Sequence, residues 1–289
     1  MPTKIEKDAV TGQETTGHEW DGIKELNSPL PKWWLYVFYA TILWSLVYYV
    51  LYPSWPGFNG YLKGVLGYSQ RVELDQKMAK ARAGQAKFLD RIKAATPAEI
   101  LKDSELLAFA QAGGRAAFAD NCAPCHGPGG GGRPQFPVLA DDDWIWGGKI
   151  EQIYATIQHG VRNDNDDSRQ GEMPAFGRDE ILNAAQIKDV TAYVLSLSDT
   201  SRKGEAIARG AAVFKEHCVA CHGETGKGNK ELGAPNLTDA IWLYGGSEKE
   251  VVAQITNPSH GVMPPWTSRL DPATVKMLAV YVHSLGGGQ

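Results

Sequence analysis

Cysteine is scarce in this sequence, and the few cysteines stand close together. The 289 residues contain four of them, arranged as two pairs: Cys122 with Cys125, and Cys218 with Cys221. None is left over for a general disulfide framework. Basic residues are not in excess either, because the formal net charge is -4, and no stripe of Lys and Arg is present that could neutralise a phosphate backbone. We therefore expect no nucleic-acid partner.

One long uncharged run stands near the N-terminus. Residues 33–52 read WWLYVFYATILWSLVYYVLY, and about 20 helical residues span the roughly 30 Å hydrocarbon core of a bilayer. Aromatic residues gather at both ends of the run, as they do at membrane interfaces. The polar residues 1–32 before it and the YPSWP after it do not fit a cleaved signal peptide. We expect a single uncleaved transmembrane helix.

A connector follows the predicted membrane helix over residues 53–104. Residues 69–93 alternate charged and small side chains with helical spacing. Thr96 and Glu99 then stand in the positions of a capping box, with Pro97 at the first helical position between them. The sequence predicts a mostly helical linker here.

The rest of the chain repeats itself. GRAAFADNCAPCHG matches GAAVFKEHCVACHG, LADDDWIWGG matches LTDAIWLYGG, GEMP matches GVMP, and VTAYVLSLS matches LAVYVHSLG, in the same order. One insertion, between His159 and Met173, lengthens the first copy. The repeat predicts two tandem helical domains, residues 105–200 and 201–289, and a mainly α fold.

Each copy contains the string C-x-x-C-H, which is typical of covalent attachment of a c-type haem. Two thiols on one helical turn can each add to a vinyl group of the porphyrin, and the neighbouring His126 or His222 can reach the iron. A zinc site would need further ligands, and no other cysteine exists. A thioredoxin-like pair would need a βαβ context, which the helical pattern does not provide. We therefore predict two covalently bound haems c.

The second axial ligand is predicted from the symmetry of the repeats. Met173 and Met263 each precede a proline at the same place in the two copies, and methionine is a common partner of histidine in electron-carrying cytochromes. His159 and His260 are rival ligands, whereas His217 and His283 have no histidine counterpart in the other copy. The sequence leaves open whether each methionine serves the haem of its own copy or of the other.

Iron held by both His and Met has no vacant position for oxygen or peroxide, so this ligand set favours outer-sphere electron transfer over catalysis. Haem attachment to thiols takes place outside the cytoplasm. We therefore expect residues 1–32 to form a cytoplasmic tail and both haem domains to lie in the periplasm of a bacterium, anchored to the inner membrane by one span.

Three features of the chain are found together: the tail HEWDGIKELNSPLPKWW, the anchor followed by YPSWP, and the two C-x-x-C-H domains. On these features nearly the whole chain resembles the dihaem cytochrome c subunits, CcoP or FixP, of cbb3-type cytochrome c oxidases. The resemblance implies an electron-transfer subunit that accepts electrons from the bc1 complex or a soluble cytochrome c. It would pass them to the monohaem and catalytic subunits, where oxygen is reduced and protons are pumped. Carried over by position, Cys122, Cys125, Cys218 and Cys221 hold haem, and His126, Met173, His222 and Met263 bind iron.

Three other functions are alternatives: a membrane-anchored dihaem cytochrome serving another periplasmic oxidoreductase, a dihaem peroxidase, and a haem-based sensor. Paired methionines argue against the peroxidase, and no kinase, cyclase or receiver sequence follows the haem motifs. Charge separates the two copies, since residues 101–200 hold eight basic and fifteen acidic side chains and residues 201–289 hold nine and eight. Most of the acidic surplus comes from Asp141, Asp142 and Asp143, with Asp164, Asp166 and Asp167 of the insertion. The first domain is therefore expected to attract a basic electron donor. The alternatives are that these carboxylates are simply solvated, or that the Asn163–Asp167 loop binds a cation.

Overall fold

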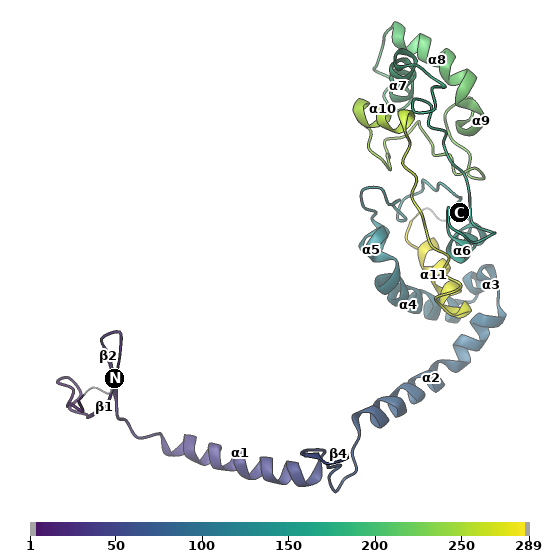
Figure 1. Ribbon diagram of the computed structural model, residues 1–289. Helices are drawn as coiled ribbons and strands as arrows, with labels where there is room; N and C mark the ends of the chain where they lie inside the picture. Colours follow the sequence, from purple (N-terminus) through teal and green to yellow (C-terminus); the bar gives the residue numbers. More distant parts are fainter. Residues whose placement is uncertain (1–3, 287–289) are drawn as a thin grey trace. The chain divides into compact units, whose positions relative to one another are not determined.

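The computed structural model describes residues 4–286 and divides into two compact units, residues 1–82 and residues 83–289 (Figure 1). Residues 1–3 of the expected tail and residues 287–289 of the expected second domain lie outside the described range. Helices dominate both units, and the described strands form two small two-stranded sheets. The prediction of a mainly α fold is confirmed.

The first unit begins with a β-hairpin that the sequence analysis did not predict. Strand β1 (Thr15–Trp20) pairs antiparallel with β2 (Ile23–Leu26), and Trp20 lies opposite Ile23. Asp21 and Gly22, between the strands, both have positive φ angles, of 51° and 85°. An Asp-Gly pair is one of the sequences that a two-residue turn of this kind requires.

Helix α1 (Lys32–Leu51) is the predicted membrane helix, displaced by one residue from the expected range. It has 20 residues and a mean hydropathy of 1.6, and none of its residues is buried within the protein. A short hairpin of β3 (Pro56–Gly57) and β4 (Gly60–Tyr61) follows. Beyond it, the amides of Val65 and Leu66 donate to the carbonyls of Val50 and Leu51 (2.9 and 3.1 Å). The chain thereby satisfies two of the helix's last carbonyls.

The connector is helical from residue 70 onward, as predicted. Helix α2 (Gln70–Ala94) starts in the first unit and ends in the second, and α3 (Pro97–Lys102) begins with the expected capping box. The Thr96 hydroxyl accepts from the Glu99 amide (3.3 Å), and the Glu99 carboxylate accepts from the Thr96 amide (2.8 Å). This reciprocal cap fixes the start of α3.

The two copies form the same succession of helices. The first copy contains α4 (Ser104–Asn121), α5 (Ala123–His126), the short 3₁₀ helix η1 (Pro128–Gly130), α6 (Ile150–His159) and α7 (Ala184–Ser198). The second contains α8 (Glu205–His217), α9 (Val219–His222), α10 (Glu248–Thr256) and α11 (Pro272–His283).

The last helix of each copy, called here its closing helix, packs against the other copy; these are α7 and α11. Helix α11 of the second copy packs on α4 and α6 of the first, and α7 of the first copy packs on α8 and α10 of the second (Figure 1). Both contacts are close at matching glycines. A Cβ atom added to Gly114 would lie 2.2 Å from the carbonyl oxygen of Met277, and one added to Gly210 would lie 2.0 Å from that of Asp189. Glycine is required at both crossings because any side chain would separate the helices.

Two hydrophobic cores result. The Cys122 core consists of buried residues of α2, α3, α4, α6 and α11, with Cys122 packed at its edge. The Cys218 core consists of buried residues of α7, α8 and α10 with Phe176 and Leu182, and Cys218 packs against it. The expected boundaries 105–200 and 201–289 describe the sequence repeats, whereas both packed cores cross them.

Chain connectivity explains the exchange. Only residues 199–204 separate α7 from α8, and two helices joined by so short a loop pack as antiparallel neighbours. Once α7 covers α8, the matching site on α4 is left for α11. The two closing sequences are similar enough for either to fill either site.

Candidate haem-binding sites

Each cysteine pair lies on a single turn at the end of a long helix. Helix α4 ends where the Cys122 amide donates to the Phe118 carbonyl (2.8 Å), and the amides of Cys125 and His126 then both donate to the Cys122 carbonyl (3.1 and 2.8 Å). The second site repeats this arrangement with Phe214, Cys218, Cys221 and His222. Both thiols and the imidazole of each motif therefore come from one turn, as attachment to a single haem requires.

The four cysteines form no disulfide, and the first cysteine of each pair is partly buried. Burial, followed by the neighbouring thiol, raises the pKa of Cys122 and of Cys218 to about 11. A thiol with a raised pKa holds little thiolate at neutral pH, and thiolate is the form that attacks disulfides and binds zinc. At neutral pH the first cysteine of each pair is therefore mainly in the thiol form.

The imidazoles are held in one orientation. The Nδ1 atom of His126 lies 3.2 Å from the Pro137 carbonyl oxygen, and that of His222 lies 3.1 Å from the Pro235 carbonyl oxygen. A carbonyl only accepts hydrogen bonds, so each Nδ1 carries the proton and each Nε2 lone pair is free for a metal. Burial lowers the pKa of both histidines, which favours the neutral, ligating form.

Each predicted methionine ligand packs against the core that holds the cysteine motif of the other copy. Met263, from the second copy, packs against the Cys122 core, and Met173, from the first copy, packs against the Cys218 core. The methionine segments, Gly171–Pro174 before α7 and Gly261–Pro264 before α11, are therefore exchanged together with the closing helices. Of the two pairings that the sequence left open, the crossed one is the arrangement in which methionine and cysteines share a core.

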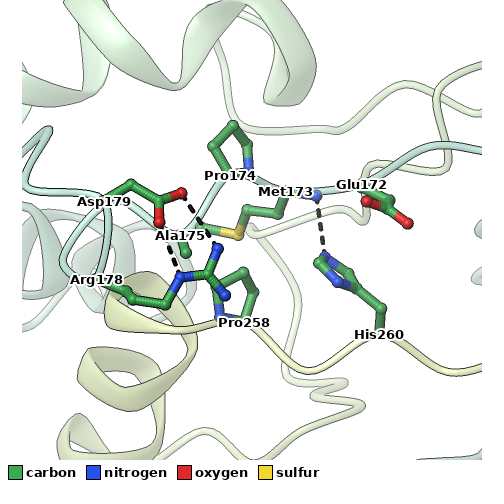
Figure 2. Close-up of a pocket in the computed structure, with 8 residues that line it drawn as sticks. All are labelled: Glu172, Met173, Pro174, Ala175, Arg178, Asp179, Pro258 and His260. Atoms are coloured by element: carbon green, nitrogen blue, oxygen red, sulfur yellow. Dashed lines mark hydrogen bonds and ion pairs between the residues drawn. The ribbon is translucent and has the colours of Figure 1, made fainter.

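Backbone pairing fixes where the methionine segments run. Val161 and Met263 exchange two amide hydrogen bonds (3.0 and 2.9 Å), and the Asn163 side-chain amide donates to the Met263 carbonyl (2.7 Å). The Met173 amide donates to Nε2 of His260 (3.1 Å; Figure 2). Each methionine is therefore held at its backbone by a residue of the other copy.

Met173 lines a hollow of about 390 Å³. Its side chain extends toward Ala175 and the paired side chains of Arg178 and Asp179, as Figure 2 shows. Pro258 and His260 also line the hollow. The hollow leaves Met173 accessible on one side, beside the Cys218 core.

The rival histidines have other partners. Nε2 of His260 accepts the Met173 amide, and Nδ1 of His159 lies 3.3 Å from the side-chain oxygen of Asn165. Of the residues between 4 and 286, no group of three or more His, Cys, Asp and Glu side chains could hold a metal ion.

Arg162 is a site residue that sequence reasoning missed. Its guanidinium donates to the carbonyls of Gly171 and Gly261, two residues before each methionine (2.7 and 2.8 Å). The signal was weak, since Arg162 belongs to the insertion and has no counterpart in the second copy.

Three family models match the chain. The N-terminal domain of cytochrome oxidase-cbb3, FixP, matches residues 12–59; cytochrome c matches residues 111–198; and cytochrome C oxidase, cbb3-type, subunit III, matches residues 205–282. Both haem motifs thus lie in cytochrome c domains. The prediction of two covalently bound haems c is confirmed at this level.

Relatives match over the full chain. The cbb3-type cytochrome c oxidase subunit CcoP of Azospirillum sp. (strain B510) is 56% identical, with 98% of each chain covered. Subunit FixP of Bradyrhizobium diazoefficiens is 51% identical, with 100% of each covered. The chain belongs to the CcoP/FixP family. The family resemblance drawn from the tail, the anchor and the two haem motifs is thereby confirmed, and the single apolar helix fits a membrane anchor in an oxidase subunit.

Proposed function

We propose that this chain is the dihaem electron-transfer subunit of a cbb3-type cytochrome c oxidase, and that its two haem sites share their axial ligands crosswise. In the first site Cys122 and Cys125 attach the haem, and His126 and Met263 bind the iron. In the second site Cys218 and Cys221 attach it, and His222 and Met173 bind the iron. The observation that carries the crossed assignment is that Met263 packs against the same core as Cys122, and Met173 against the same core as Cys218.

The residues fit the group they are proposed to hold. Free thiols sit on one turn, a neutral imidazole offers Nε2, and a thioether lies in the same core. With both axial positions filled, a haem supplies one-electron transfer without binding oxygen. The protein's part is to hold the ligands, keep water away from them and set the potential through burial.

Crossed ligation makes the two sites interdependent. Neither repeat contains a complete site, because the haem at each cysteine motif obtains its methionine ligand from the other copy. A change in the packing of α7 or α11 would therefore be felt at the haem of the copy that the helix covers. Both haems are expected to keep a fixed relative position, as electron transfer between them requires.

Orientation is proposed from the chemistry of the motifs. Thioether formation takes place outside the cytoplasm, so the haem domains are placed in the periplasm and the tail before α1 in the cytoplasm of the bacterial inner membrane. The exposed aromatic residues at both ends of α1, such as Trp33 and Tyr49, are suited to the two interfaces.

Partners follow from the family. The chain would pass electrons to the monohaem and catalytic subunits of the oxidase and receive them from a donor cytochrome c or the bc1 complex. The acidic surplus of the first copy favours a basic donor. Service to another periplasmic oxidoreductase is the second candidate, but the match of residues 12–59 to a domain named for the cbb3 oxidase favours the first.

Three experiments test this function. Purification of the tagged chain from membranes should bring down an oxidase with both b- and c-type haem, and mass spectrometry should find two haems on the chain. Met263→Ala and Met173→Ala should each lower the potential of one haem and open its iron to carbon monoxide, whereas His159→Ala should do neither. A chain with fewer than two haems, or a histidine change with the effect expected for methionine, would contradict the proposal.

A further inference from the structure

Arg162 connects two segments that the sequence separates widely. Its Nε donates to the carbonyl of Gly261 (2.8 Å) and its Nη1 to the carbonyl of Gly171 (2.7 Å). These two glycines occupy the same position in the repeats, at the start of Gly-Glu-Met-Pro and Gly-Val-Met-Pro. One side chain therefore binds both methionine segments at equivalent atoms.

The backbone at Arg162 is held in an uncommon conformation. Its φ angle is +50°, in the left-handed region that side chains other than glycine rarely adopt. Such strain persists only where surrounding contacts determine it. Here the Arg162 amide donates to the Arg169 carbonyl (2.8 Å), and its neighbour Val161 pairs with Met263. The insertion is folded so that this arginine points at the two segments.

The environment of Arg162 matches a positioning role. Among the described residues, no carboxylate lies within ion-pair distance of its guanidinium, which lies 6.0 Å from the ring centre of Trp146. Two charge-assisted bonds to carbonyls and an aromatic face thus stabilise the half-buried cation. The planar fork of arginine suits two acceptors at once, and a lysine ammonium would not reproduce that geometry.

We infer that Arg162 is a shared positioning residue for both distal methionines, so that a single side chain holds the iron ligation of the two haems together. The inference rests on the proposed assignment of Met173 and Met263 as ligands. It also gives the insertion a role, because one clamp at the junction of the copies serves both segments and the second copy needs none.

Arg169 provides a matched control. It belongs to the same insertion, and its guanidinium lies 5.4 Å from the ring centre of Trp146. Its hydrogen bonds, however, go to the Thr156 hydroxyl (2.8 Å) and the Gln152 carbonyl (3.3 Å), both in α6. Loss of Arg169 removes a comparable cation without touching either methionine segment.

The test uses the assembled oxidase with Arg162→Ala, Arg162→Lys, Arg169→Ala and Arg169→Lys. The readouts are the charge-transfer absorption of methionine-ligated ferric haem, carbon monoxide binding to the c-type haems, and the two c-haem potentials. Arg162→Ala is expected to weaken the absorption of both haems, to allow carbon monoxide binding at both irons, and to lower both potentials. Arg169→Ala should leave all three unchanged.

Arg162→Lys keeps the charge and the apolar stem, so it serves if the alanine variant fails to assemble. On warming, it should lose the charge-transfer absorption of both haems at a lower temperature than the wild-type and Arg169→Lys proteins. Wild-type behaviour of the Arg162 variants, or an effect on one haem alone, would overturn the inference. Met173→Ala and Met263→Ala are measured alongside: if these leave the absorption intact, the ligand assignment itself fails.

Discussion

Val161 and Met263 exchange both of their backbone hydrogen bonds, with amide to carbonyl distances of 3.0 and 2.9 Å. The pair joins the insertion of the first copy to the methionine segment of the second. It places Met263 at the Cys122 core, and the exchanged helix α11 continues from there. Local pairing at this bridge and distant packing of α11 therefore favour the same crossed arrangement.

The closeness of α4 and α11 predicts a sharp effect at Gly114. Gly114→Ala would place a methyl group 2.2 Å from the Met277 carbonyl oxygen, so the helices must separate, at a cost of about 1–3 kcal/mol in the free energy of unfolding. Thermal unfolding of the purified protein measures this. Gly84→Ala is the control, because a Cβ there meets nothing within 4 Å. Equal unfolding temperatures for the two variants would show that α11 does not approach α4 as described.

Asp143 predicts a pH-dependent contribution to stability. Burial, then the charges of Asp239 and Asp141, raises its pKa from 3.8 to about 6. The folded protein therefore binds a proton more tightly than the unfolded chain between about pH 4 and 6, and this site's contribution falls as pH rises through that window. Asp143→Asn should raise the free energy of unfolding at pH 7, measured by thermal unfolding, by less than about 1 kcal/mol because the carboxyl is partly exposed. The gain should vanish near pH 4, and a gain of equal size at both pH values would refute the assignment.

The acidic insertion predicts the salt dependence of electron entry. Asp164, Asp166 and Asp167 are exposed, so changing all three to Asn removes charge without disturbing a buried contact. Electron entry from a basic cytochrome c should slow at low ionic strength, and its dependence on salt should flatten, because complementary charges speed encounter and are screened over about 8–10 Å. Stopped-flow reduction measures both quantities. Unchanged rates together with an unchanged salt slope would mean that the insertion is merely solvated.

Much of this architecture could be predicted from the sequence, because it rests on local patterns. The uncharged run gave α1 to within one residue, and Thr96 with Glu99 gave the start of α3. The first hairpin was missed although Asp21-Gly22 is a strong turn signal. The strands read TTGHEW and IKEL, so no alternation of apolar and polar residues marked them in the sequence.

The exchange between the copies could not be predicted, because it depends on a choice between nearly equal alternatives. Each closing helix carries a tyrosine at the same position of its sequence. Tyr193 of α7 packs against Phe214, and Tyr281 of α11 packs against Phe118. Either closing helix thus satisfies either core, and the short link after α7 decides between them. Arg162 was missed for a related reason, since its two acceptors are backbone carbonyls that carry no sequence signature.

Crossed ligation is tested most directly by combining one methionine change with each proximal histidine change in turn. Both cysteine pairs stay intact, and the charge-transfer absorption reports how many haems keep His and Met together. If Met263 belongs to the haem of His126, then Met263→Ala with His126→Ala damages one haem, and about half of the absorption remains. Met263→Ala with His222→Ala would then damage both haems and abolish it. The reverse result, half remaining with His222→Ala and none with His126→Ala, would contradict the account.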